Sequence, residues 1–140
     1  MKKILNFSLI IAFGLAIAFT GCKKYDEGPM LSLASKKARV VNTWKIEKLF
    51  LNDLDITSTN LTNLSIYSIE FKNDNTFIEN GTGYTETGKW DFDSKKENLL
   101  CTYNGSITDD KYEILKLKSS EMWLKYTDGA FAYEFHYVTK

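Results

Sequence analysis

Few residues in this chain have the type and spacing that covalent catalysis or metal binding requires. The sequence contains two cysteines, Cys22 and Cys101, and one histidine, His136. Sites that need two imidazoles or four thiolates are therefore excluded. A reactive thiol needs a neighbouring base, and none is identifiable near Cys101, so we predict a small core residue on a strand. We expect no enzyme, although dispersed carboxylates could still converge in space.

The remaining polar candidates give no catalytic pair. Asp109 and Asp110 are adjacent, and neighbours on a strand point to opposite faces, so we interpret them as turn charges. His136 stands between Phe135 and Tyr137 and therefore faces the other side of the strand from them, which predicts an outward or rim position. One histidine without a carboxylate cluster is no metal site, so we predict neither a metal nor a cofactor.

Cys22 ends a segment that is organised like a secretory signal. Lys2 and Lys3 form a positive start, residues 4–19 are almost wholly apolar, and the small pair Thr20-Gly21 precedes Cys22. This order is typical of a cleaved signal peptide. A spanning anchor is the alternative, but it needs about 20 apolar residues, more than this run supplies.

The residues Phe19-Thr20-Gly21-Cys22 resemble the lipobox of bacterial lipoproteins, with Phe19 in place of the usual leucine. The resemblance implies that residues 1–21 are removed and that Cys22 becomes an N-terminus carrying fatty-acyl chains such as palmitate. Two or more chains hold a protein stably on a membrane. Residues 22–31 are polar, and we predict a flexible tether. Lys23, by resemblance to diderm sorting, implies the outer membrane and leaves open which side the domain faces.

Overall charge and composition limit the possible partners. Lysine plus arginine number 18 and aspartate plus glutamate number 18. Nucleic-acid binding needs a clear basic excess, so we exclude it. Aromatic residues make up 14% of the chain and there is one proline, which argues against wholesale disorder.

Residues 32–140 form one predicted domain with period-two alternation, the pattern of half-buried strands. A short helix capped by Ser32 is expected first. A polar stretch at 52–63 is long for a hairpin connection. The mixed pattern of 111–118 predicts a bulge or a strand covered on both faces. The expected strands are 42–50, 65–72, 76–80, 84–92, 98–103, 111–118, 121–126 and one that starts at 131.

These eight short strands are joined by turn residues, and no helix is long enough for a parallel crossover. An antiparallel sheet of this size must hide its edges, and closure into a barrel removes them. We predict an all-β fold, an eight-stranded antiparallel up-and-down barrel with a short N-terminal helix. A β-sandwich is the alternative.

Several segments resemble the lipocalin-like domain of Bacteroidota lipoproteins. Asn42-Thr43-Trp44 is similar to the lipocalin Gly-x-Trp motif, and residues 68–77, 87–92 and 112–117 follow the same pattern. The resemblance implies a barrel open at one end that holds a small apolar or amphipathic molecule, with Trp44 packed at the closed end.

Large apolar side chains of one parity could line a pocket or could fill the barrel, because eight strands leave an interior just wide enough for either. Our leading hypothesis is a membrane-anchored lipoprotein that binds a small hydrophobic ligand. The alternative is a filled barrel that serves as a protein-interaction or envelope-assembly module through residues 52–63. The candidate ligand-binding residues are Trp44, Ile46, Phe50, Ile69, Phe71, Phe77, Trp90, Phe92, Ile114, Tyr133 and Phe135.

Overall fold

Buried and exposed positions alternate along most strands of the computed structural model, which describes residues 34–140. Such alternation is what one buried sheet face requires. The predicted signal peptide, residues 1–21, and the tether with Cys22, residues 22–31, lie outside the described residues. None of the helices within 34–140 is both long and apolar enough to span a membrane.

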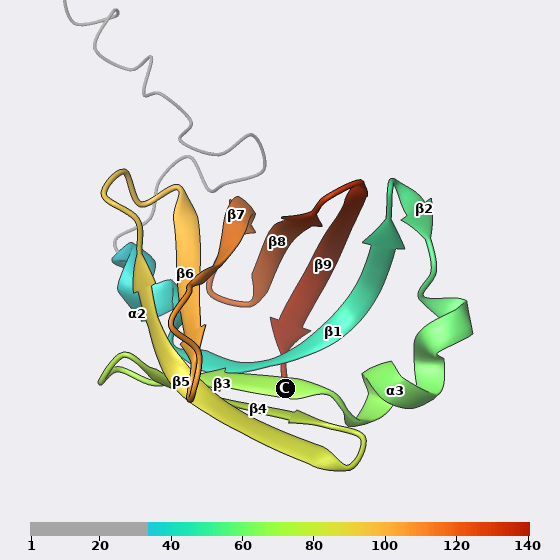
Figure 1. The fold of residues 1–140 in the computed structure, drawn as a ribbon, viewed down its shortest axis with the longest axis horizontal. Helices are drawn as coiled ribbons and strands as arrows, with labels where there is room; N and C mark the ends of the chain where they lie inside the picture. The colour runs from blue at the N-terminus through green and yellow to red at the C-terminus, as the bar shows by residue number, and fades with distance from the viewer. Residues whose placement is uncertain (1–33) are drawn as a thin grey trace, which may run out of the picture.

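The elements follow one another along the chain as a meander of antiparallel strands with a few short helices (Figure 1). In order, they are α2 (Lys36–Val40), β1 (Asn42–Leu51), β2 (Leu54–Asp55), a 3-10 turn (Ser58–Asn60), α3 (Leu61–Ile66), β3 (Ser68–Phe71), β4 (Thr76–Gly81), β5 (Tyr84–Phe92), β6 (Asn98–Tyr103), β7 (Asp110–Leu117), β8 (Glu121–Asp128) and β9 (Phe131–Thr139).

The sheet closes on itself through β1. This strand pairs with β3 over Asn42–Trp44 and with β9 from Trp44 to Leu51. Because the first and last long strands are hydrogen-bonded neighbours, the sheet is a closed antiparallel barrel. This confirms the predicted fold class. The short β2 is one strand beyond the eight, and it pairs with the end of β1.

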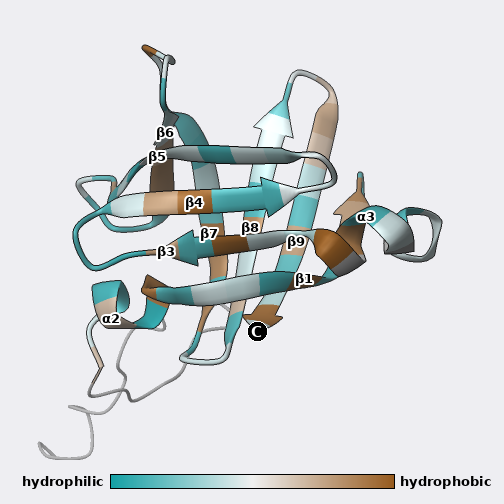
Figure 2. Ribbon diagram, turned by 90° about the horizontal axis from the view of Figure 1, so that it is seen from below, coloured by the Kyte–Doolittle hydropathy of each residue, from teal (hydrophilic) through white to brown (hydrophobic). Residues whose placement is uncertain are grey.

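Connections in an up-and-down barrel alternate between its two ends. We call the end with α2 and the turns β3–β4, β5–β6 and β7–β8 the closed end. The open end carries the connections β1–β3, β4–β5, β6–β7 and β8–β9. Figure 2 shows α2 and α3 at opposite ends of strands β1, β3 and β4.

Helix α2 is fastened across the closed end by hydrogen bonds to three different parts of the barrel. Lys36 Nζ donates to the Lys96 carbonyl, Lys37 Nζ to Asn75 Oδ1, and Arg39 Nη1 to the Leu117 carbonyl at 3.0 Å. These contacts hold a helix of only five residues, too short to be stable alone.

Trp44 packs beneath α2 and has no exposed surface. Its Nε1 donates to the Val40 carbonyl at 2.8 Å, so its one polar group is satisfied inside the core. The other side chains with almost no exposure make the same core continuous, namely Val40, Phe71, Phe77, Trp90, Leu99, Leu117 and Met122.

The helix begins later than predicted. Ser35, rather than Ser32, is the N-cap, and its Oγ accepts from the Ala38 amide at 3.1 Å. Both serines are good caps, so the residue type did not distinguish them. The start is decided by how α2 sits over the barrel end.

The predicted polar loop at 52–63 and the predicted strand at 65–72 both need correction. Residues 54–66 contain β2, the 3-10 turn and α3, so β3 begins only at Ser68. Beyond Trp44, β1 no longer pairs with β3, and α3 packs against both β1 and β4. The helix turns Leu64 toward the core, and this contact between distant strands overrides the local strand pattern.

Two strands contain register shifts. One lies between Ile114 and Lys116 of β7, which agrees with the first of the two alternatives predicted there, a bulge. The other lies between Ile46 and Lys48 of β1. A bulge adds one residue to one strand, so every side chain beyond it changes face.

Candidate functional site

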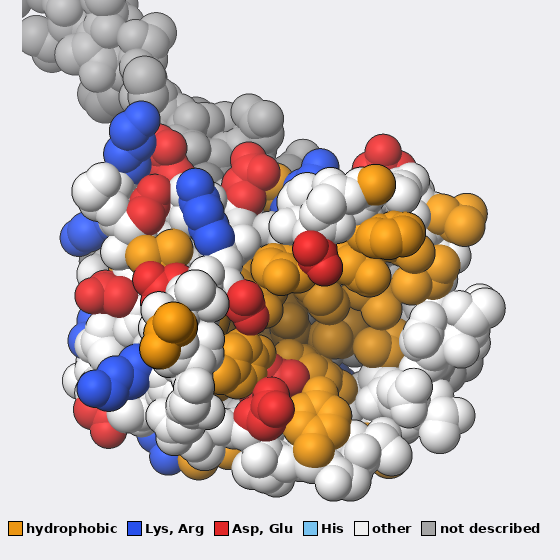
Figure 3. Space-filling model, in the orientation of Figure 1, with side chains coloured by type: hydrophobic (Ala, Val, Ile, Leu, Met, Phe, Trp, Pro, Cys, Tyr) orange, Lys and Arg blue, Asp and Glu red, His pale blue; other side chains and the backbone are white. Residues whose placement is uncertain are grey.

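A cavity lies inside the barrel, toward the open end. Figure 3 shows the corresponding hollow, walled by hydrophobic side chains, with acidic side chains at its border. The cavity has about 250 Å³ of empty volume, including the part open to solvent. Its enclosed part leaves room for only one or two waters. Its walls are formed by Tyr67, Ile69, Phe71, Glu79, Cys101, Tyr103, Tyr112, Leu124 and Tyr137.

Glu79 is the charged residue of this wall, and it is only 8% exposed. It follows Phe77 by two positions on β4, so both side chains face the interior. The Tyr84 hydroxyl donates to Glu79 Oε1 at 3.1 Å, and the Tyr103 hydroxyl donates to Oε2 at 2.5 Å. Three successive strands thus supply one carboxylate and two phenols that meet at the cavity, with Tyr84 at the exposed rim.

The tyrosines around Glu79 stay neutral over a wide pH range. Burial, the Glu79 charge and the hydrogen bond to it raise the pKa of Tyr84 to about 12. Burial, followed by Tyr112 and the bond to Glu79, raises the pKa of Tyr103 far above its usual value. Each phenol therefore remains an O–H donor toward Glu79 at neutral pH.

A second tyrosine pair also lines the cavity. Tyr67 and Tyr137 share a side-chain hydrogen bond, and burial is the main cause that raises the pKa of each hydroxyl. Their ring centroids are 6.4 Å apart. Because these hydroxyls are satisfied by one another, the aromatic faces remain as the cavity wall.

Most of the predicted ligand-binding residues fill the barrel. Ile69 and Phe71 belong to the cavity wall. Others are buried in the core, namely Trp44, Ile46, Phe77, Trp90 and Ile114. Phe92 and Phe135 pack against the core from partly buried positions, and Tyr133 is also partly buried. The structure therefore combines the two alternatives, a filled closed end and a small cavity near the open end.

Phe50 lies on the other face of the sheet, so its predicted inward position is wrong. It stands opposite Glu134 of β9, while Leu49 stands opposite Phe135. Paired residues share a face, and the Phe50 ring lies 5.0 Å from that of His136 on the barrel exterior. The bulge after Ile46 causes the change of face, and the alternation of residue types did not reveal it.

Sequence reasoning missed Glu79, Tyr103, Tyr112 and Tyr137 as wall residues. The parity of the strands could have identified them. Each lies two positions from another inward-facing residue of its strand, as Glu79 does from Phe77. The error was to select almost only apolar residues from the positions that face inward.

Cys101 is buried, as predicted. It is 2% exposed and lines the cavity. Burial, followed by the charges of Asp110 and Glu79, raises the pKa of its thiol far above the usual value. A thiol in this environment is a poor nucleophile.

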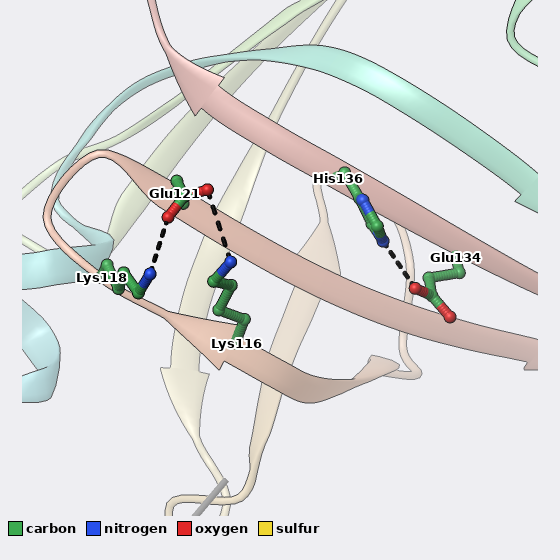
Figure 4. A network of polar contacts seen from close by, with 5 residues as sticks. All are labelled: Lys116, Lys118, Glu121, Glu134 and His136. Carbon is green, nitrogen blue, oxygen red and sulfur yellow. Dashed lines mark hydrogen bonds and ion pairs between the residues drawn. The ribbon is translucent and has the colours of Figure 1, made fainter. Parts of the chain in front are cut away.

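A polar network covers the outer face of β7, β8 and β9 (Figure 4). Lys116 Nζ lies 3.9 Å from the centroid of Trp123, whose ring stacks on His136 at 3.9 Å. His136 Nε2 contacts Glu134 Oε1 at 2.6 Å. His136 therefore points outward, within the predicted alternatives.

The same network includes a pair of lysines on one carboxylate. Glu121 contacts Lys118 at 3.0 Å and Lys116 at 3.4 Å. The hydrogen bond from Lys118 is the main cause that lowers the pKa of Glu121. All of these charges are paired on a sheet surface, and we interpret the network as structural. Among the described residues, no three His, Cys, Asp or Glu side chains are grouped closely enough to hold a metal ion.

Comparisons with known proteins extend the fold assignment only. No protein-family model matches the chain, and no curated protein matches it in sequence. The fold is similar to the crystal structure of a DUF4847 family protein from Bacteroides vulgatus, with a TM-score of 0.55 at 14% identity. The match covers 75% of this chain and 96% of that one.

Proposed function

We propose that this protein is a lipid-anchored protein of the outer membrane whose barrel binds a small ligand with an apolar body. The anchor rests on the signal-like segment and on Cys22. The binding role rests on the cavity, whose walls are mostly aromatic and aliphatic with a few polar groups, the usual composition of ligand pockets. No covalent step is involved.

The observation that carries the proposal is the buried carboxylate of Glu79. Removing a charge from water costs several kcal/mol unless it is compensated. A barrel that served only as a packed scaffold would be at least as stable if Glu79 and its hydroxyl partners were all replaced by apolar side chains. Polar groups that break the rule of an apolar interior are concentrated at functional sites.

The size of the cavity limits the ligand. Ligand pockets usually have volumes of about 300–1,000 Å³, and about 250 Å³ is present here with the open part included. The enclosed portion has room only for a group about the size of one or two waters, such as a single polar headgroup. Any larger portion of the ligand would extend through the open end.

Titration of the purified residues 32–140 with 2-phenylethanol tests the proposal by methyl NMR. The expected result is saturable shifts at Ile69 and Leu124, which line the cavity, and much smaller shifts at Leu99 and Leu117 in the closed-end core. Native mass spectrometry after gentle extraction from the producing cells should also detect a co-purified small molecule. Absence of both signals would refute a ligand-binding barrel.

A second candidate function is supported by the exposed apolar side chains. Five large hydrophobic residues of the described chain are strongly exposed, and every one lies in or beside an open-end connection. Leu54, at 68% exposure, belongs to the 52–63 segment. Exposed apolar groups gathered in one region are typical of protein contact sites. The other four are Ile66, Tyr84, Ile107 and Phe131.

Site-specific photo-crosslinking in intact envelopes separates the two functions. A photoreactive residue at position 54 should give a discrete protein adduct if the open end is an interaction surface, while the same residue at exposed position 47 of β1 should not. Equal labelling at both positions would count against this second function.

A further inference from the structure

The inward-facing positions of the barrel carry charges of one sign. Glu86 stands opposite Glu79, and Asp110 stands opposite Cys101. Asp128 follows Leu124 by four positions on β8, so the two side chains face the same side of the sheet. Residues directly opposite one another in an antiparallel pair share a face. These four carboxylates therefore face the interior or its opening.

The carboxylates near the opening lie close enough to influence one another. Burial, then the charges of Asp109 and Asp128, raise the pKa of Asp110. The same two inward carboxylates, Asp110 and Asp128, raise the pKa of Tyr126 beside them. The entrance to the cavity is thus a region of negative potential.

No lysine, arginine or histidine occupies an inward position on the eight barrel strands described here. The cations of these strands alternate to the outer face, where Lys48 stands opposite His136 and Lys125 opposite Glu134. Lys37 of α2 lies 5.9 Å from the Trp90 ring, but at the closed end. A low-dielectric cleft lined by charges of one sign concentrates ligands of the opposite sign.

Glu79 retains capacity for another hydrogen bond. An ionised carboxylate has about four acceptor sites, and the two tyrosines use one on each oxygen. A donor on a ligand would find acceptor lone pairs there. A ligand carboxylate would instead face like-charge repulsion inside a poorly solvated cavity.

The cavity walls favour the same class of ligand. Tyr67, Tyr103, Tyr112 and Tyr137 contribute aromatic rings beside Glu79. The negative faces of such rings attract an ammonium group, most strongly when it is desolvated. Aromatic walls also accept an apolar ligand body.

From this cavity, its buried carboxylate and its aromatic walls, we propose that the ligand is a small primary amine with an aromatic or short aliphatic body. Its ammonium group binds Glu79 within the tyrosine cluster. This inference rests on the proposed ligand-binding function and specifies the ligand class.

Three ligands of nearly equal size test the inference: 2-phenylethylamine, 2-phenylethanol and 3-phenylpropanoate. Binding to residues 32–140 is measured by calorimetry or NMR titration at pH 7 and low salt. The amine should bind at least about tenfold more tightly than the alcohol, equivalent to about 1.4 kcal/mol, and the acid should bind most weakly. The preference for the amine should decrease as salt is added.

A matched pair of variants locates the effect. Glu79→Gln keeps the shape and an acceptor oxygen but removes the charge, so the amine-to-alcohol ratio should fall to about one. Glu70→Gln changes a glutamate on the outer face of β3, opposite Ile78, and should leave the ratio unchanged. Thermal unfolding of each variant establishes that it is folded, and the three-ligand comparison on the natural chain needs no variant.

The outcomes separate this inference from the proposed function. Equal binding of amine and alcohol, or tighter binding of the acid, would overturn the amine assignment while the barrel remained a ligand-binding protein. Failure of all three to bind would overturn the amine assignment, and, if native mass spectrometry also detects no co-purified molecule, the ligand-binding function as well. Retention of the amine preference in Glu79→Gln would also overturn the assignment of the ammonium group to Glu79.

Discussion

The two ends of the barrel are built from different kinds of side chain. At the closed end, α2 covers an interior of large apolar residues such as Trp44 and Trp90, which are almost completely buried. At the open end, the interior holds Glu79 with its tyrosines, and the rim exposes apolar side chains such as Phe131. One closed sheet therefore separates the part that provides most of the stability from the part that has features of a binding site.

The difference has a physical basis. Dense apolar packing provides the favourable free energy of burial, at about 25 cal/mol per Å². A cavity and a buried carboxylate both lower stability. The protein can retain them at one end because large apolar side chains around Trp44 are almost completely buried at the other.

The largest effect is expected from removing the centre of the closed-end core. Trp44→Ala deletes a fully buried ring and its hydrogen bond to Val40, and should lower the free energy of unfolding by about 3–5 kcal/mol. Urea denaturation measures this change. Trp123→Ala removes an indole from the outer face and is the control, with a smaller expected loss. Equal losses at the two positions would contradict the division between core and surface.

A smaller effect is expected at the open end. Glu79→Leu leaves the partly buried Tyr103 hydroxyl without its acceptor, and should cost about 1–3 kcal/mol of unfolding free energy. Adding Tyr103→Phe removes the unpaired donor, so the double variant should recover most of that loss. A double-mutant cycle by urea denaturation measures the coupling. If the losses simply added, Glu79 and Tyr103 would not act as a pair.

Cys101 lies on the cavity wall and tests how far solvent enters. Burial raises the pKa of its thiol, and the enclosed cavity has space for very little water. Alkylation of residues 32–140 by iodoacetamide at pH 8 should be at least about tenfold slower in native buffer than in urea. Mass spectrometry over time measures the rate. Equal rates would indicate that the open end admits solvent freely.

The smallest effects are expected from pH, with opposite signs at the two ends. In the β5–β6 turn at the closed end, Asp93 accepts hydrogen bonds from Glu97 and from Asn98. The Asn98 bonds are the main cause that lowers the Asp93 pKa to about 2. A lowered pKa means that its contribution to stability is present above about pH 4 and is lost as pH falls toward 2. Asp93→Asn should flatten the acid side of the pH–stability curve.

At the open end, burial and Glu79 raise the pKa of Tyr84 to about 12. The folded state therefore holds this proton more tightly, so the contribution of Tyr84 is present below about pH 10 and is lost as pH rises toward 12. Tyr84→Phe should flatten the alkaline side only. Thermal melts across the pH range test both variants, and an effect on the wrong side of the curve would contradict the assignment.

Much of the fold could be predicted because its signals are local. The boundaries predicted for β5 and β6 agree with the structure, since alternation and turn residues act over a few neighbours. The start of β3 was misplaced because α3 packs against both β1 and β4, and these contacts form only when the barrel closes. Phe50 was assigned to the wrong face because a bulge shifts the parity of β1.

The sequence by itself determined an antiparallel barrel, its turns and most of its core, because the alternation of apolar and polar residues decides which face of each strand is buried. Only the tertiary structure brought Glu79 on β4 together with Tyr84 on β5 and Tyr103 on β6. Residues 24 positions apart, as Glu79 and Tyr103 are, meet only once the strands have paired in register. The volume left at the open end also depends on how every inward side chain packs, and no local pattern contains that information.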